Sequence, residues 1–129
     1  MTARILMVDD EPDAEVLFRQ HFRREIRNGV YAFDFALSAE EALGKLRDDA
    51  VSDAILVLSD INMPGMSGLD LLREIRGLWP RTIVFMITAY GDSGTERTAR
   101  ELGADRFITK PVDFDELKGD LADVLEQDR

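Results

Sequence analysis

The chain has 129 residues, of which 45% are hydrophobic and 33% are charged, and its formal net charge is −10. This length suits one domain with a continuous core, the acidic excess disfavours direct binding to nucleic acid or an anionic membrane, and the lack of cysteine excludes disulfides and thiolate metal sites. No apolar stretch of the sequence is long enough to cross a bilayer, so we expect residues 1–129 to form a single soluble, cytoplasmic domain.

Apolar runs alternate with amphipathic segments five times along the chain, and the first run, Arg4–Val8, predicts a strand. Pro12 suits the first turn of a helix, which we expect to continue as one helix until Asn28-Gly29, a typical helix end. The second run, Tyr31–Ala36, carries aromatic residues on one face and Asp34 on the other, which favours an edge strand.

The middle of the chain contains the most apolar of the predicted strands, Ala54–Ser59, as is typical of the centre of a parallel sheet. A helix precedes it, and Ser38 and Glu41 are placed to open that helix as a capping box. A loop and a further helix follow it, with Ser67 as the expected N-cap and Trp79-Pro80 as the expected end.

The last third of the chain adds two more strands, each followed or preceded by a helix. Thr82–Ile87 and Arg106–Thr109 predict strands, and the helix between them is expected from about Asp92 to Leu102, with Gly103 after its end. The apolar stripe of that helix is thin. The final helix is expected to open at Asp113, a favoured N-cap residue.

This alternation predicts an α/β fold in which a central parallel sheet of five strands carries helices on both faces. Right-handed crossovers leave few arrangements, and the usual open one is the flavodoxin-like (βα)5 fold with strand order 2-1-3-4-5. In that order, ligands bind beside the carboxyl ends of the first and third strands, where the winding of the chain reverses.

Residues that suit phosphoryl chemistry follow four of the predicted strands. Asp9-Asp10 follows the first strand, Asp60 the third, Thr88 the fourth and Lys110 the fifth. In a parallel sheet these side chains meet at one edge, where three carboxylates repel one another and tend to hold a cation. Mg2+ prefers oxygen ligands and keeps several waters. We therefore expect Asp10 and Asp60 to bind Mg2+ directly and Asp9 to act through water.

The backbone carbonyl of Asn62, just after the third strand, can complete this ligand set. The Asp60 carboxylate can attack a phosphoryl group and form an acyl phosphate, while Lys110 can neutralise the phosphoryl oxygens and Thr88 can donate to one. Taken singly, each residue has an ordinary structural interpretation, because acids cap helices, threonine favours strands and lysine lies in solvated loops. The agreement of four strand ends favours the functional interpretation.

The same residues resemble the receiver domain of two-component response regulators, over essentially the whole chain. The residues that carry the resemblance are Asp9-Asp10, Asp60 with Met63-Pro64-Gly65 and Gly68, Thr88-Ala89, and Lys110-Pro111. The resemblance implies that Asp60 accepts a phosphoryl group from a histidine kinase or a phosphotransfer protein. It also implies that Mg2+ is held by Asp9, Asp10, Asp60 and the Asn62 carbonyl, and that the phosphoryl oxygens are contacted by Thr88 and Lys110.

The resemblance further implies a conformational switch. Phe107 matches the family's switch aromatic, which turns when the phosphoryl group draws Thr88 inward. The Lys110-Pro111 peptide bond is expected to be cis, and Asn62 and Tyr90 occupy positions that tune how long the phosphoryl group persists. In this picture the surface of the last two helices and the strand between them changes and binds a downstream output domain or target protein. That surface is also a candidate face for a phosphorylation-dependent dimer.

The sequence favours a phosphorylation-controlled signalling domain, with no enzyme activity beyond its own phosphorylation and dephosphorylation. An aspartate-nucleophile phosphatase of the haloacid dehalogenase type is an alternative, but it needs acids spaced two apart after the first strand, and Asp9 and Asp10 are adjacent. A dinucleotide-binding domain is a further alternative, but it needs a Gly-rich turn after the first strand, where this chain has acidic residues. A docking domain of the same fold that is never phosphorylated is the other alternative. We expect no output domain within residues 1–129, whether these form a single-domain regulator or a fragment of a longer one.

Overall fold

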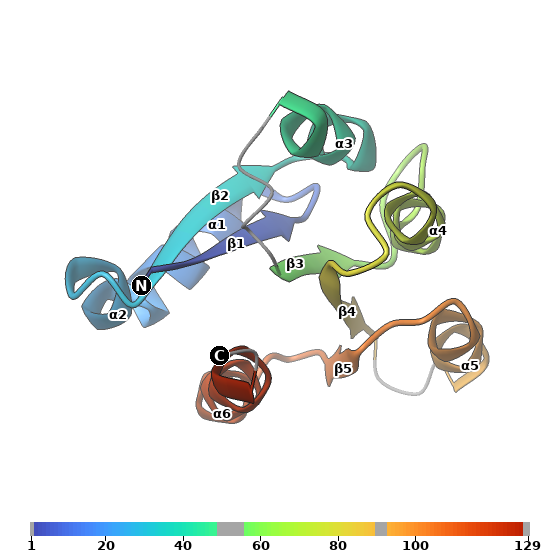
Figure 1. The fold of residues 1–129 in the computed structure, drawn as a ribbon. Coiled ribbons are helices and arrows are strands. Elements are labelled where there is room, and N and C mark those ends of the chain that lie inside the picture. The colour runs from blue at the N-terminus through green and yellow to red at the C-terminus, as the bar shows by residue number, and fades with distance from the viewer. Residues whose placement is uncertain (1, 49–55, 90–92, 128–129) are drawn as a thin grey trace.

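The computed structural model describes residues 2–48, 56–89 and 93–127, which form a parallel sheet of five strands with helices on both faces (Figure 1). The strand order is β2-β1-β3-β4-β5, which confirms the predicted arrangement. The strands are β1 (Ala3–Val8), β2 (Tyr31–Ala36), β3 (Leu56–Asp60), β4 (Ile83–Thr88) and β5 (Arg106–Thr109). The helices are α1 (Pro12–His21), α2 (Arg23–Arg27), α3 (Ala39–Asp48), α4 (Gly68–Leu78), α5 (Ser93–Glu101) and α6 (Phe114–Gln127). None of the helices in this described part of the chain has the length and apolarity to span a membrane.

Each face of the sheet carries its own apolar core. One core joins the sheet to α1 and α6, and Phe22 and Leu117 are fully buried in it. The other joins the sheet to α3, α4 and α5, and Leu72 is fully buried there. Figure 1 shows these two groups of helices on opposite sides of the sheet. The central strand β3 is buried at every position, whereas Asp34 of the edge strand β2 is exposed and pairs with Arg4 at 3.3 Å.

The single helix predicted from Pro12 to Asn28 is wrong, because the structure divides it into α1 and α2 at Phe22. Phe22 has φ −105° and ψ 18°, although its N–H still bonds the Phe18 carbonyl and its own carbonyl accepts from Ile26. Its buried ring packs against Phe33 and Tyr31, with centroids 5.0 and 6.0 Å away. The break is therefore a local bend at a residue whose ring is held by the core.

Most predicted helix ends are confirmed by their caps. Ser67 and Asp70 form a reciprocal capping box at α4, which ends at Trp79. The Ser38 hydroxyl accepts from the Glu41 N–H at the start of α3, but the Glu41 carboxylate accepts from Leu37, one residue before the partner that a capping box requires. Residues 54–55 of the predicted third strand and residue 92 of the predicted fourth helix lie outside the described residues.

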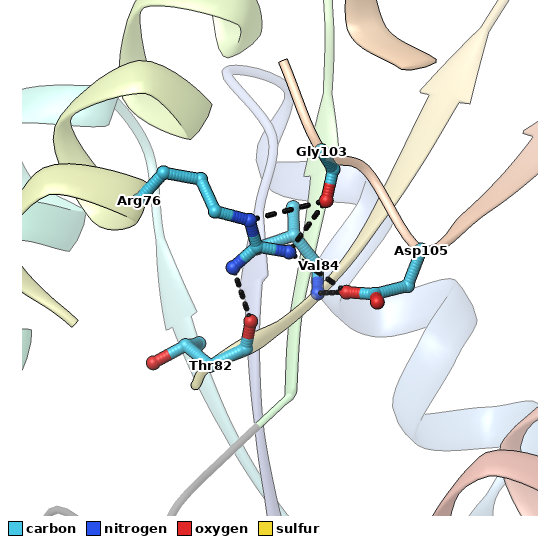
Figure 2. Close-up of polar contacts among 5 residues, drawn as sticks. All are labelled: Arg76, Thr82, Val84, Gly103 and Asp105. Atoms are coloured by element: carbon cyan, nitrogen blue, oxygen red, sulfur yellow. Dashed lines mark hydrogen bonds and ion pairs between the residues drawn. The ribbon is translucent and has the colours of Figure 1, made fainter. Parts of the chain in front are cut away.

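A polar clamp joins α4 to the strands at the far end of the sheet from the carboxyl ends (Figure 2). Arg76 donates to the Gly103 carbonyl through Nε at 3.1 Å and Nη2 at 2.6 Å, and to the Thr82 carbonyl through Nη1 at 2.5 Å. Its Nη2 also lies 2.9 Å from Asp105 Oδ2, which accepts from the Val84 N–H. One guanidinium thus ties the end of α4 to the starts of β4 and β5.

We expect Arg76→Ala to lower the free energy of unfolding by about 2–3 kcal/mol, because it leaves carbonyls and a carboxylate without a charged donor in a site where Arg76 is only 22% exposed. Arg76→Lys should recover little of this lost stability, since a single ammonium cannot reproduce the planar arrangement of donors of the guanidinium. Urea unfolding midpoints at constant slope measure both changes.

The matched control is Arg73→Ala on the same helix, where the side chain is exposed and pairs with Asp70 at 3.4 Å. Exposed pairs of this kind contribute about 0.2–1 kcal/mol. Equal losses in Arg73→Ala and Arg76→Ala would mean that the clamp contributes no more than an ordinary surface ion pair.

Candidate functional site

The acids predicted to form the site meet at the carboxyl ends of the two central strands. Asp9 directly follows β1, and its carboxylate accepts from the Glu11 N–H at 2.9 Å. Asp60 is the last residue of β3 and is 4% exposed. One carboxylate oxygen each from Asp9, Asp10 and Asp60 lies within 4.8 Å of the others. The pairing of β1 with β3 produces this cluster, because it sets the two strand ends side by side.

Lys110 adds one positive charge to the cluster from the end of β5. Its Nζ lies 2.9 Å from Asp60 Oδ2, and its backbone N–H donates to the Thr88 carbonyl. The Lys110-Pro111 peptide bond is cis, the state that the resemblance implies. Thr88, the last residue of β4, is buried, and its hydroxyl lies 3.5 Å from the Ala89 carbonyl oxygen. The predicted acids, hydroxyl and ammonium therefore share one edge of the sheet.

The backbone around Asp60 is held from two sides. A Cβ at Gly68 would lie 2.3 Å from the Asp60 carbonyl oxygen, so only glycine lets the start of α4 pack this closely on the strand end. The buried Ser59 hydroxyl donates to the same carbonyl at 2.9 Å. Asn62 is exposed, and its N–H donates to Asp60 Oδ1 at 3.3 Å. These contacts fix the backbone that carries the Asp60 carboxylate.

The crowding of acids alters the proton affinity of the site. Burial raises the pKa of Asp9, and the negative charges of Asp60 and Asp10 raise it further, against the lowering effects of the Glu11 N–H and of Lys110. Burial acts to lower the pKa of Lys110, but the hydrogen bond and charge of Asp60 outweigh it, so that the pKa of Lys110 is raised. The cluster therefore favours positive charge nearby, and the Lys110 ammonium already supplies one such charge.

The donor set fits Mg2+. All three side chains offer carboxylate oxygens, the ligand type that Mg2+ prefers. Asp60 has one oxygen engaged by Lys110 and the other by a single N–H at 3.3 Å, so its carboxylate keeps accepting capacity. Burial, and then the negative charges of Asp60 and Asp10, raise the pKa of Asp9, and a divalent ion would offset those charges.

The raised pKa of Asp9 predicts an inverted pH dependence of stability. Because the pKa is higher in the folded protein than in the unfolded chain, folding favours the protonated form, and the resulting stability is present at low pH and lost as the pH rises through the raised pKa. We expect Asp9→Asn to be more stable than the parent at neutral pH without divalent metal, and the difference to close as the pH falls through that pKa.

Urea midpoints across this pH range test the expectation, with Asp34→Asn on the exposed edge of β2 as the matched control. A parent protein that equals or exceeds Asp9→Asn in stability at neutral pH would contradict it. The Asn side chain keeps an oxygen that can accept from Glu11, so the comparison isolates the charge.

One predicted residue of the described chain lies away from the acidic cluster. Phe107 is half-buried on β5 and packs against the core beneath α3, α4 and α5. Tyr90 lies outside the described residues. The sequence interpretation missed Ser59, although a lone polar residue at the end of an apolar run was the available signal. It also missed Arg100, which stacks on Phe107 and has no local sequence signal.

Comparisons with known proteins agree with this geometry. A family model of the response regulator receiver domain matches residues 5–122. Sporulation initiation phosphotransferase F of Bacillus subtilis is 33% identical over 120 residues, which cover 92% of this chain and 90% of that protein. Response regulator protein PilR of Pseudomonas aeruginosa is 39% identical over 124 residues, which cover 95% of this chain and 26% of that protein.

A solved structure shows the same fold. The response regulator receiver domain protein of Clostridium thermocellum matches with a TM-score of 0.87 and 26% identity, over 98% of this chain and 96% of that one. The chain spans about half or less of the length of several of the curated relatives that it matches, PilR included.

Proposed function

Since the chain belongs to the response regulator receiver family, we propose that it accepts a phosphoryl group on Asp60 in the presence of Mg2+ and thereby changes its surface at α5, β5 and α6. The observation that carries the proposal is the placement of Asp60. Its buried carboxylate lies 2.9 Å from Lys110 Nζ and within 4.8 Å of oxygens of Asp9 and Asp10. That arrangement suits a nucleophile whose charge must be balanced as it reacts.

The proposed reaction forms a bond between an Asp60 oxygen and phosphorus while the bond from phosphorus to the donor's nitrogen or oxygen breaks. Such transfers depend mainly on positioning and on neutralising charge. Lys110 supplies an ammonium that is close to Asp60 already, and Thr88 supplies a hydroxyl donor from the neighbouring strand. When bound by Asp9, Asp10, Asp60 and the Asn62 carbonyl, Mg2+ supplies further positive charge.

The partners follow from this chemistry. We propose that the donor is a histidine kinase or a phosphotransfer protein in the cytoplasm, and that the chain acts on no substrate besides itself. Residues 1–129 would form one receiver domain, and an output domain or a separate target would read its state. Asn62 and Tyr90 are proposed to tune the lifetime of the acyl phosphate, and a phosphorylation-dependent dimer would use the same surface as the target.

The surface proposed to switch contains a weakly packed helix. Within α5, whose residues are all described, Ala99 is the one fully buried residue. Helices with few buried apolar contacts have low local stability and shift at small cost. Amide exchange after activation is therefore expected to change in α5 and β5, and a change confined to α1 would contradict this part of the proposal.

The test of the central proposal is incubation with a small acyl-phosphate donor, with and without Mg2+, followed by intact-mass measurement. One phosphoryl group should be gained, the gain should require Mg2+, and peptide mapping should place it on Asp60. No gain at any Mg2+ concentration would favour a docking domain that is never phosphorylated. Steady turnover of a phosphate ester would favour the phosphatase.

A further inference from the structure

Arg100 in the last turn of α5 lies over the ring of Phe107 on β5. The guanidinium carbon is 4.8 Å from the ring centroid, a distance typical of a cation–π contact. The same guanidinium pairs through Nη2 with Glu96 Oε1 at 2.8 Å, one helical turn earlier. The ring thus has the apolar core on one side and a cation, itself held by a carboxylate, on the other.

In the described part of the chain, this contact adds to a small apolar attachment of α5 to the sheet. Ala99 is the buried apolar residue of the helix, and Leu102 and Ala104, just after it, are partly buried. The segment after the helix is fixed at Gly103 by Arg76 of α4 (Figure 2). Because the Gly103 carbonyl is held by Arg76, we expect α5 to move by pivoting about that end, and the Arg100–Phe107 contact lies close to this pivot.

The ring is also connected to the phosphoryl site through the sheet. In the register of β4 and β5, Met86 pairs with Phe107, and Thr88 pairs with Thr109. Side chains two residues apart on a strand point to the same face, so Phe107 and Thr88 are diagonal neighbours on the α5 face of adjacent strands. A displacement of Thr88 toward Asp60 changes the space beside the ring.

We propose that Arg100 is a positioning residue that holds Phe107 in the arrangement where Asp60 is a carboxylate paired with Lys110. The inference rests on the proposed function, because it assigns Arg100 a part in the response to phosphorylation. An exposed cation–π contact changes an equilibrium by about two- to fivefold. If the competent arrangement is a minor population, removing the contact tightens phosphoryl-analogue binding by the same factor.

The first test uses the protein without phosphoryl donor or metal. In Arg100→Ala, the NMR signals of 13C-labelled Phe107 should show increased averaging between side-chain rotamers, and α5 amides should exchange about two- to fivefold faster. Arg97→Ala is the matched control, because it removes the same charge from an exposed position on the same helix. Equal behaviour of the two variants would overturn the proposal.

The second test measures the apparent affinity for beryllium fluoride with Mg2+, a mimic of the phosphoryl group. Arg100→Ala should bind about two- to fivefold more tightly than the parent, and this gain should vanish when Phe107→Leu is also present. A gain that persists without the ring would overturn the proposed route through Phe107. If the parent binds no beryllium fluoride, the proposed function fails, and the first test still decides whether Arg100 positions the ring.

Discussion

Replacing Asp60 by asparagine is expected to abolish the phosphoryl gain from a small acyl-phosphate donor and Mg2+, measured by intact mass. The amide carries no negative charge and cannot form an acyl phosphate. Asp60 is also the residue that joins the acidic cluster to Lys110, at 2.9 Å. No other carboxylate of the cluster has that contact among the described residues, so Asp9 and Asp10 are not expected to take over.

The fold should survive this change. Asparagine has nearly the same shape as aspartate, and removing one of three clustered carboxylates relieves repulsion while it also loses the ion pair with Lys110. Circular dichroism and urea midpoints should therefore stay close to those of the parent. Asp34→Asn makes the same chemical change on the exposed edge of the sheet and should leave the phosphoryl gain complete. A full gain in Asp60→Asn would place the acceptor elsewhere.

The sheet and its functional edge could be predicted because both depend on the spacing of apolar residues along the chain and on the order of the strands. Apolar runs locate the strands, the right-handed crossover restricts their order, and the residue after each run then lies at a known edge. Asp60 and Lys110 are 50 residues apart in the chain, yet each position follows from its own strand end. The N-caps Ser67 and Asp113 could also be predicted, because a cap depends on only a few neighbouring residues, and the structure confirms both.

The features that escaped prediction depend on where long or bulky side chains reach in three dimensions. The bend at Phe22 is associated with rings from β2, which no pattern within the helix reports. Arg76 contacts carbonyls as far as 27 residues away, and its sequence position resembles that of any exposed helix arginine. Arg100 and Phe107 meet only because the turn at Gly103 brings α5 back over β5.

Lys110→Gln is expected to slow phosphoryl gain by about 10²- to 10³-fold, the usual effect of removing one preorganised donor from a site where charge develops. It should also lower the free energy of unfolding by about 1–2 kcal/mol, less than for a fully buried pair because the Lys110 side chain is 43% exposed. Initial rates of mass gain and urea midpoints measure the two effects. Lys45→Gln, at an exposed position on α3, removes the same charge and should change neither.

The two effects of Lys110→Gln separate when Asp60 is also replaced. In an Asp60→Asn background, Lys110→Gln should cost little stability, because the carboxylate that the ammonium balances is gone, and the difference between backgrounds measures their coupling. Since the pKa of Lys110 is raised, the stability that its charge contributes is present at neutral pH and is lost as the pH rises through that raised value. A loss of stability that is the same in both backgrounds would show that Lys110 acts through packing, and that the charge balance at Asp60 does not depend on it.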